Sequence, residues 1–334
     1  MSKLLVLGDT HFGEKELSPV MVSAVTKAFV LGIDHDTEVA SAGDYIEAGE
    51  VADRLMQRRA MRQVLGGMLQ YQSRTGRPIH VVPGNHERYL HLDHLRDIAP
   101  GVEHELHPLM YEKDGVVLHH GDLADTKVRP LTAHLDTYKG NSTADLKDFL
   151  ENDPEFAADR QAYHARNMIF VWDWMRLGEK IGFSNMRQLQ LFDWIARGSI
   201  SRSIQAALRD NSLTRQASGD FILNTWLAEQ MPDAWAVLSG HTHMPYHTSW
   251  AHDASGRRTT IANVGSIYST ARAPTAVMLD TSARTSTMLA FRDDAWRAEN
   301  TITHGGPKSF FMPATHLPTV KGLVDGKATG QIAG

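Results

Sequence analysis

The chain has 334 residues, with 42% hydrophobic residues, 22% charged residues, no cysteine and a formal net charge of −5. The lack of cysteine excludes disulfides and thiolate ligands, so a metal site must be built from His, Asp, Glu and Asn. No apolar run approaches the ~18 residues of a membrane-spanning helix, so we expect no integral membrane association. The acidic balance argues against nucleic acid as the main partner, apart from a local basic groove.

The start of the chain shows no export signal. Its apolar stretch, residues 4–7, is too short for the hydrophobic region of a signal peptide and is followed at once by Gly8 and Asp9. We therefore expect a cytoplasmic protein. At roughly one domain per ~150 residues, the length predicts about two structural units.

The first 124 residues alternate between strand and helix patterns. Short apolar runs predict strands at 3–8, 37–42, 79–82 and 116–118. Helical composition separates them at 19–31 and 50–71. Strands that alternate with helices are typical of a layered α/β core.

Beyond this region the pattern changes to consecutive helices, which predicts a helical cap inserted at residues 125–233. Strand patterns resume afterwards, at 234–238, 259–264, 276–279 and 285–291. We therefore expect a core formed by residues 1–124 and 234–303. Residues 304–334 are rich in Gly, Pro and Thr, which predicts an extended or partly disordered tail.

Five polar motifs stand at the ends of predicted strands, where open α/β sheets place their ligands. They are Gly8-Asp9-Thr10-His11, Gly43-Asp44, Gly84-Asn85-His86-Glu87, His119-His120-Gly121-Asp122 and Gly240-His241-Thr242-His243. Each joins a side chain that can bind a metal to a residue suited to a tight turn. Together they supply the oxygen and nitrogen donors that two divalent cations sharing a carboxylate would need.

As an ordered series, these motifs resemble the calcineurin-like metallophosphoesterases. The resemblance covers the core and leaves out the cap and the tail. It implies an α/β four-layer sandwich, in which two central mixed sheets are flanked by helices and interrupted by a helical insertion. It also implies two divalent metal ions, with Mn expected first and Fe, Zn, Co or Ni also compatible with the donors.

The family resemblance implies a role for each matching residue. It gives seven metal ligands, with Asp9, His11 and His243 on one ion, Asn85, His120 and His241 on the other, and Asp44 bridging both. A hydroxide shared by the two ions would then attack phosphorus in line.

Further residues are expected to act on the leaving group or the phosphate, or to orient a residue that does. His86 would be the general acid, oriented by Glu47 or by Glu87. Ala48 occupies the position of the phosphate-clamping arginine of the protein-phosphatase branch, which argues against a phosphoprotein substrate. Arg88 could clamp phosphate instead.

The resulting prediction is a phosphomonoesterase or phosphodiesterase acting on a phosphorylated small molecule that the cap selects. Three alternatives stay open: a pyrophosphatase acting on a nucleotide-lipid such as UDP-diacylglucosamine, a DNA nuclease, and a non-catalytic scaffold of the same fold. The first comes from a second resemblance: the His-Gly-Asp motif followed by helices is similar to the hydrolases that cleave the pyrophosphate of UDP-diacylglucosamine, in which a helical lid receives the lipid chains. In this chain the aromatic residues Phe170, Trp172 and Trp174 could accept acyl chains. The sequence gives no indication of the oligomeric state.

Overall fold

The computed structural model describes the segments that build the core and parts of the rest. These are residues 3–12, 18–45, 59–84, 95–96, 99–107, 110–122, 152, 154–155, 158, 223–225, 227–243, 245–251, 257–267, 273–306 and 310–311. Most of the predicted cap and tail lies outside the described residues. No helix among the described residues is long and apolar enough to cross a membrane.

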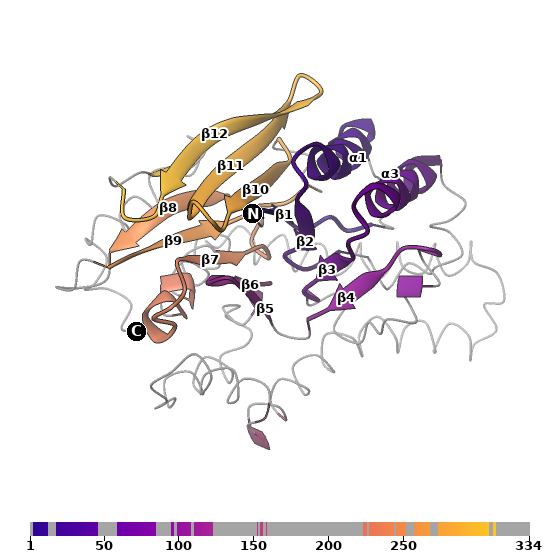
Figure 1. Ribbon diagram of the computed structural model, residues 1–334. Helices are drawn as coiled ribbons and strands as arrows, with labels where there is room; N and C mark the ends of the chain where they lie inside the picture. Colours follow the sequence, from indigo (N-terminus) through magenta and orange to yellow (C-terminus); the bar gives the residue numbers. More distant parts are fainter. Residues whose placement is uncertain are drawn as a thin grey trace, which may run out of the picture.

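Two mixed β-sheets form the centre of the molecule (Figure 1). The seven-stranded sheet has the order β12 (Ala295–Thr303), β11 (Thr285–Arg292), β10 (Thr275–Asp280), β1 (Lys3–Leu7), β2 (Glu38–Ser41), β3 (Ile79–Val81) and β4 (His104–Leu106). The six-stranded sheet has the order β13 (Phe310–Phe311), β8 (Tyr246–Ala251), β9 (Arg258–Asn263), β7 (Ala236–Ser239), β6 (Val116–His119) and β5 (Met110–Lys113).

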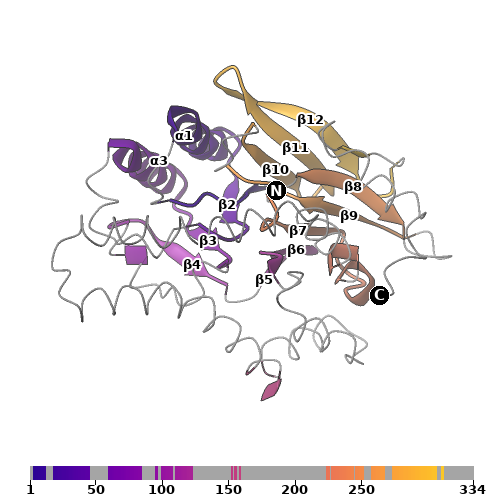
Figure 2. The same cartoon turned by 180° about the vertical axis from the view of Figure 1, so that it is seen from behind.

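Helices α1 (Pro19–Asp34) and α3 (Arg59–Thr75) lie side by side over one face of the seven-stranded sheet (Figures 1 and 2). Helix α1 begins where its sequence provides a cap, because the Ser18 side chain accepts a hydrogen bond from the Met21 amide and Pro19 occupies the first turn. Its apolar face then buries Val25 and Phe29 against the sheet and α3.

Strand β1 connects the two halves of the core, because its side chains alternate between them. Leu5 and Leu7 pack into the cluster beneath the helices, whereas Leu4 and Val6 pack into the cluster between the two sheets. This strand is therefore buried on both faces, and the residue that follows it emerges from the middle of the molecule.

The predicted fold of two mixed sheets flanked by helices is confirmed. Helical residues 223–225 and 227–230 lie against the six-stranded sheet. There the Asn224 side-chain amide donates hydrogen bonds to Ser239 of β7 and to Tyr246 of β8. The helical insertion predicted at 125–233 falls mostly outside the described residues.

Several strands were not predicted from the sequence. Strands β4 and β5 have three and four residues, too few to show a period. Strand β12 is mostly polar because much of it is exposed at the sheet edge. Helix α3 ends at Thr75 rather than at the predicted residue 71.

His247 links the two sheets and should make their association sensitive to acid. Its side chain is fully buried, Asn300 donates to Nδ1 at 3.2 Å, and Nε2 lies 2.8 Å from Ser286 Oγ. These contacts fit a neutral ring, and burial lowers the pKa of His247 from 6.5 to about 3.

Because the folded-state pKa of His247 is the lower one, its contribution to the free energy of unfolding is complete above pH 6.5. It should be lost at about 1.4 kcal/mol per pH unit as the pH falls toward 3. Urea unfolding of the metal-free wild type between pH 7 and 4 should show this dependence of the free energy of unfolding on pH. The dependence should be weaker in His247→Gln and unchanged in a control variant at the exposed His35. Equal slopes in all three proteins would contradict the assignment.

Candidate metal centre

The site forms where loops from the two sheets meet at the carboxyl ends of their parallel strands. Asp9 follows β1 and Asp44 follows β2, while His120 and His241 follow β6 and β7 of the other sheet. Backbone hydrogen bonds hold these loops together, since Ala42 N donates to Leu7 O and Gly240 N donates to His120 O. Each bond lies within one sheet, so the two donor loops of that sheet are held side by side.

One group of donors surrounds Asp9, which is completely buried. His243 Nε2 lies 2.8 Å from Asp9 Oδ2, and the rings of His11 and His243 meet edge to face with centroids 5.4 Å apart. The three residues offer ligand atoms that all lie within 4.8 Å of one another. Two imidazoles and a carboxylate at this spacing suit a divalent first-row cation.

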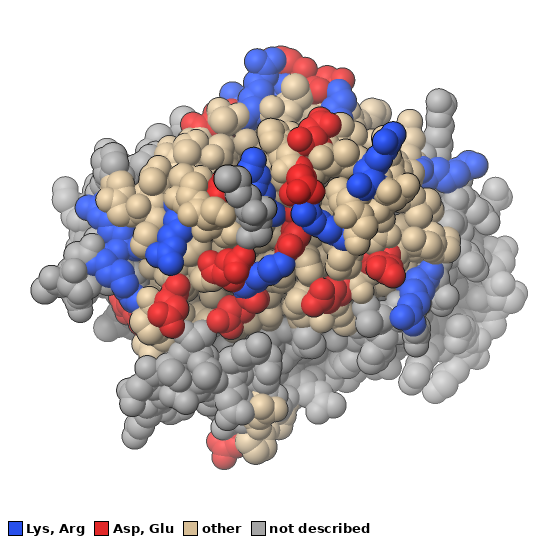
Figure 3. Space-filling view, viewed as in Figure 1, with Lys and Arg blue, Asp and Glu red and all other residues tan. Residues whose placement is uncertain are grey.

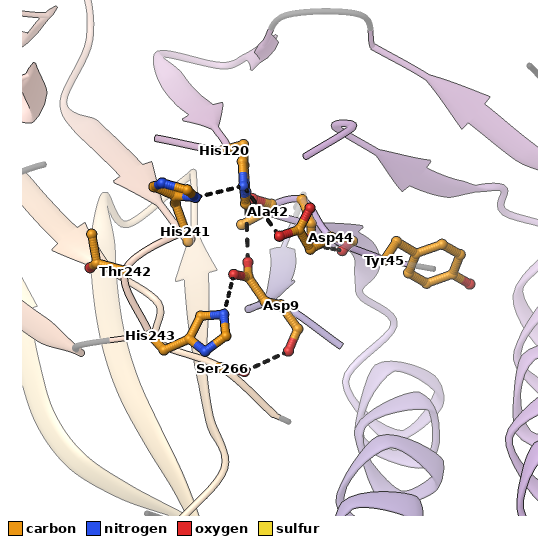
Figure 4. Close-up of polar contacts among 12 residues, drawn as sticks. Asp9, Ala42, Asp44, Tyr45, His120, His241, Thr242, His243 and Ser266 are labelled. Atoms are coloured by element: carbon orange, nitrogen blue, oxygen red, sulfur yellow. Dashed lines mark hydrogen bonds and ion pairs between the residues drawn. The ribbon is translucent and has the colours of Figure 1, made fainter. Parts of the chain in front are cut away.

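A second group surrounds Asp44, which is also buried. His120 Nε2 lies 3.5 Å from Asp44 Oδ2 and 3.1 Å from His241 Nδ1 (Figure 4). The ligand atoms of Asp44, His120 and His241 again lie within 4.8 Å of one another. The same Asp44 oxygen is 3.8 Å from His11 Nε2, a residue of the first group. Asp44 therefore stands between the two groups.

The orientation of His120 is set by the backbone. Its Nδ1 lies 3.0 Å from the carbonyl oxygen of Ala42, so a proton on Nδ1 completes that hydrogen bond and leaves the Nε2 lone pair facing Asp44 and His241. An imidazole anchored in this way is a typical metal ligand. The loop of Ala42 thus positions both Asp44 and the histidine opposite it.

The donors are brought together by a backbone that most residues avoid. His11, Asp44, His241 and His243 all have positive φ angles, of 43°, 39°, 36° and 54°. Such left-handed conformations cost on the order of 1 kcal/mol or more for residues with a side chain. Four of them among the six donors indicate that the surrounding hydrogen bonds impose this geometry.

Glycines leave the space that the side chains of the site occupy. A Cβ on Gly43 would overlap the His120 ring, one on Gly84 would overlap the Asp44 carboxylate, and one on Gly240 would lie 2.5 Å from Asp9 Oδ1. Gly43 also has a φ of 111°. Close contacts therefore require glycine in three motifs, and at Gly43 the left-handed backbone requires it as well.

The structure brings together six of the seven predicted ligands: Asp9, His11, Asp44, His120, His241 and His243. The seventh, Asn85, lies outside the described residues, as do His86, Glu47 and Arg88. The donors that are described fit two divalent cations, because they divide into two groups of nitrogen and carboxylate ligands that Asp44 joins.

Three supporting hydrogen bonds come from the end of β9 and the turn that follows it. Ser266 Oγ donates to the Asp9 carbonyl oxygen at 2.9 Å, and Ile267 N donates to the same oxygen. Asn263 Nδ2 donates to Thr242 Oγ1 at 3.0 Å and so braces the loop between His241 and His243. The sequence Asn263-Val264-Gly265-Ser266 is thus part of the site.

Sequence reasoning missed a buried polar contact behind the metal donors. His119 Nε2 lies 2.6 Å from Asn224 Oδ1, and both residues are buried. Asn224 belongs to a segment predicted only as helix, and no local pattern marked it. The only available signal was that His119 adjoins His120.

Comparison of the sequence with family models identifies the family of this chain. Residues 2–254 match the family model of the calcineurin-like phosphoesterases. The chain belongs to this family. Membership implies a hydrolase of phosphoesters that uses a dinuclear divalent metal centre.

Individual relatives are remote from this calcineurin-like phosphoesterase. No curated protein matches the chain by sequence. Among solved structures, a dimetal phosphatase from Danio rerio is similar at 11% sequence identity, with a TM-score of 0.36 and coverage of 93% of this chain and 98% of that one.

Gly84→Ala should disrupt the site without replacing any of the metal ligands. The added Cβ would meet both the carboxylate and the backbone nitrogen of Asp44. We therefore expect the affinity for divalent metal to fall about tenfold or more, and the free energy of unfolding to drop by ~1–3 kcal/mol. Metal analysis after dialysis against Mn²⁺ would measure this. Gly66→Ala is the matched control, because a Cβ there meets nothing within 4 Å. Unchanged metal content in Gly84→Ala would contradict the proposed crowding.

Proposed function

We propose that this protein hydrolyses phosphoesters at two divalent cations that share the Asp44 carboxylate. The observation that carries the proposal is the position of Asp44 Oδ2, which lies 3.8 Å from His11 Nε2 in one donor group and 3.5 Å from His120 Nε2 in the other. A carboxylate reaching both groups is what a bridged pair of ions needs.

Each described donor has a definable task in this scheme. Asp9, His11 and His243 would hold one cation, and His120 and His241, with Asn85, would hold the other. When bound, two such ions lower the pKa of a water between them and neutralise the phosphate oxygens. Burial of Asp9 and Asp44 keeps bulk water from screening the charges they supply.

The proton for the leaving group would come from His86. Gly84, two residues before His86, packs directly against Asp44. The motif that contains His86 therefore starts beside the metal donors. An imidazole titrating near neutrality can hold a proton and release it to an alkoxide. Glu47 would orient His86, and Arg88 would grip a phosphate oxygen.

The substrate would be a phosphorylated small molecule chosen by the cap at residues 125–233. Two observations support this choice over nucleic acid. The net charge is −5, and basic and acidic side chains are interspersed over the described part of the face seen in Figure 3. A protein that binds DNA through many phosphates usually presents a continuous basic surface.

Asp44→Asn should abolish most turnover, because an amide lacks the charge and the second equivalent oxygen that bridge two cations. We expect kcat with Mn²⁺ to fall by at least about 100-fold on phosphomonoesters or phosphodiesters. Asp34→Asn, at an exposed position at the end of α1, should keep wild-type activity. Equal activity of the Asp44 and Asp34 variants would refute the proposal.

The substrate panel should include nucleotides, a nucleotide-lipid pyrophosphate, and single-stranded and double-stranded DNA. Fastest turnover of the pyrophosphate or of DNA would replace the proposed substrate class with that alternative. Two bound metals with no hydrolysis of any panel member would identify a scaffold.

His86→Ala should be most harmful where the leaving group needs a proton. An alkyl phosphate has a strongly basic leaving oxygen and should lose roughly 10²–10⁴-fold in kcat, whereas p-nitrophenyl phosphate should lose far less. Steady-state kinetics on both esters measure the difference. A uniform loss on the two substrates would assign His86 to binding instead of proton transfer.

A further inference from the structure

A third cluster of metal-binding side chains lies on a different part of the molecule. His80 of β3 and Glu105 of β4 are direct partners in the parallel register of the seven-stranded sheet, so their side chains share one face. His107 follows two residues after Glu105 and is held by a backbone bond from its N to Val81 O. None of the three belongs to the motifs of the dinuclear centre.

The distances within this cluster match those of a tetrahedral ion. His80 Nδ1 lies 3.1 Å from His107 Nε2 and 3.4 Å from Glu105 Oε2, and His107 Nε2 lies 3.9 Å from Glu105 Oε1. Ligands at the usual 2.0–2.1 Å from zinc are about 3.3 Å apart in a tetrahedron. All three ligand atoms lie within 4.8 Å of one another.

A carboxylate stands behind His80 and selects its tautomer. Glu38 Oε2 of β2 lies 3.6 Å from His80 Nε2, on the opposite side of the ring from His107. A proton on Nε2 directed at Glu38 leaves the Nδ1 lone pair pointing at His107 and Glu105. Carboxylate partners of this kind accompany the histidine ligands of most zinc sites.

Glu38 is itself fixed and ionised. Lys113 Nζ lies 2.6 Å from its Oε1, and the Tyr111 hydroxyl donates to Oε2 at 3.2 Å. The ammonium group of Lys113 compensates the charge of the Glu38 carboxylate and holds it in place. Glu38, Glu105 and Lys113 together carry one net negative charge, which favours a cation beside the two imidazoles.

We propose that His80, Glu105 and His107 form a separate site for one Zn²⁺ ion. Two imidazoles and one carboxylate are donors that zinc accepts, and a solvent molecule completes the fourth position because Glu105 is 56% exposed. The ion joins β3 to β4, the last strand in this sheet of the described chain. It therefore stabilises that edge and takes no part in hydrolysis.

The number of bound zinc ions tests the site. Wild-type protein, His107→Ala, and His35→Ala at an exposed helix end should be dialysed against buffered Zn²⁺ and analysed for metal. We expect wild type and His35→Ala to bind one more zinc than His107→Ala. The added zinc should also raise Tm further in wild type than in His107→Ala, because the ion binds only the folded state.

Glu105→Gln covers the case in which His107→Ala does not fold, because an exposed glutamate can be replaced without disturbing the core. It should bind the third zinc at least about tenfold more weakly. In Asp44→Asn the third zinc should remain while ions of the dinuclear centre are lost, which separates this inference from the proposed hydrolysis. The same zinc content and affinity in wild type, His107→Ala and Glu105→Gln would overturn the proposal and identify the cluster as a hydrogen-bonded histidine pair.

Discussion

Two buried carboxylates, Asp9 and Asp44, constrain the rest of the structure. One imidazole, that of His120, lies within 4 Å of both, with Nδ1 3.7 Å from Asp9 Oδ1 and Nε2 3.5 Å from Asp44 Oδ2. Two negative charges brought so close in a buried place are costly unless cations compensate them. The surrounding histidines supply nitrogen ligands, so divalent ions can compensate this charge. The chemistry of the family follows from this arrangement.

The fold supplies this arrangement by placing the ends of two sheets together. Strand β1 is packed on both faces and delivers Asp9 to the junction, and β2 delivers Asp44 beside it. The donors on the other sheet come from β6 and β7, which are parallel neighbours. The core packing of Leu4 and Val6 against that sheet therefore sets the separation between the donors of one sheet and those of the other. Left-handed backbone at four donors then turns the side chains inward.

Much of this could be predicted from the sequence, because the donors sit in short motifs that each follow an apolar strand. The sequence predicted Gly43 and Gly84 only as turn residues, and the structure adds that they lie against the His120 ring and the Asp44 carboxylate. The short apolar run of residues 3–8 identified β1, and the run is continuous because both faces of this strand are buried.

Other features depend on register and could not be read locally. His80 and Glu105 are 25 positions apart, and only the pairing of β3 with β4 makes them neighbours. Asn224 reaches His119 across the sheet from a segment with an ordinary helical pattern. Strand β12 was not predicted, because it exposes polar residues along the edge of the sheet and its hydrophobic periodicity is therefore weak. In each case the deciding contact is long-range.

The most direct test of the account is anomalous X-ray diffraction from crystals of the protein soaked in Mn²⁺. Two peaks about 3.5–4 Å apart, one beside Asp9 and His243 and one beside His120 and His241, with the Asp44 carboxylate between them, are the predicted result. A single peak, or peaks that leave Asp44 without a metal neighbour, would contradict the central claim.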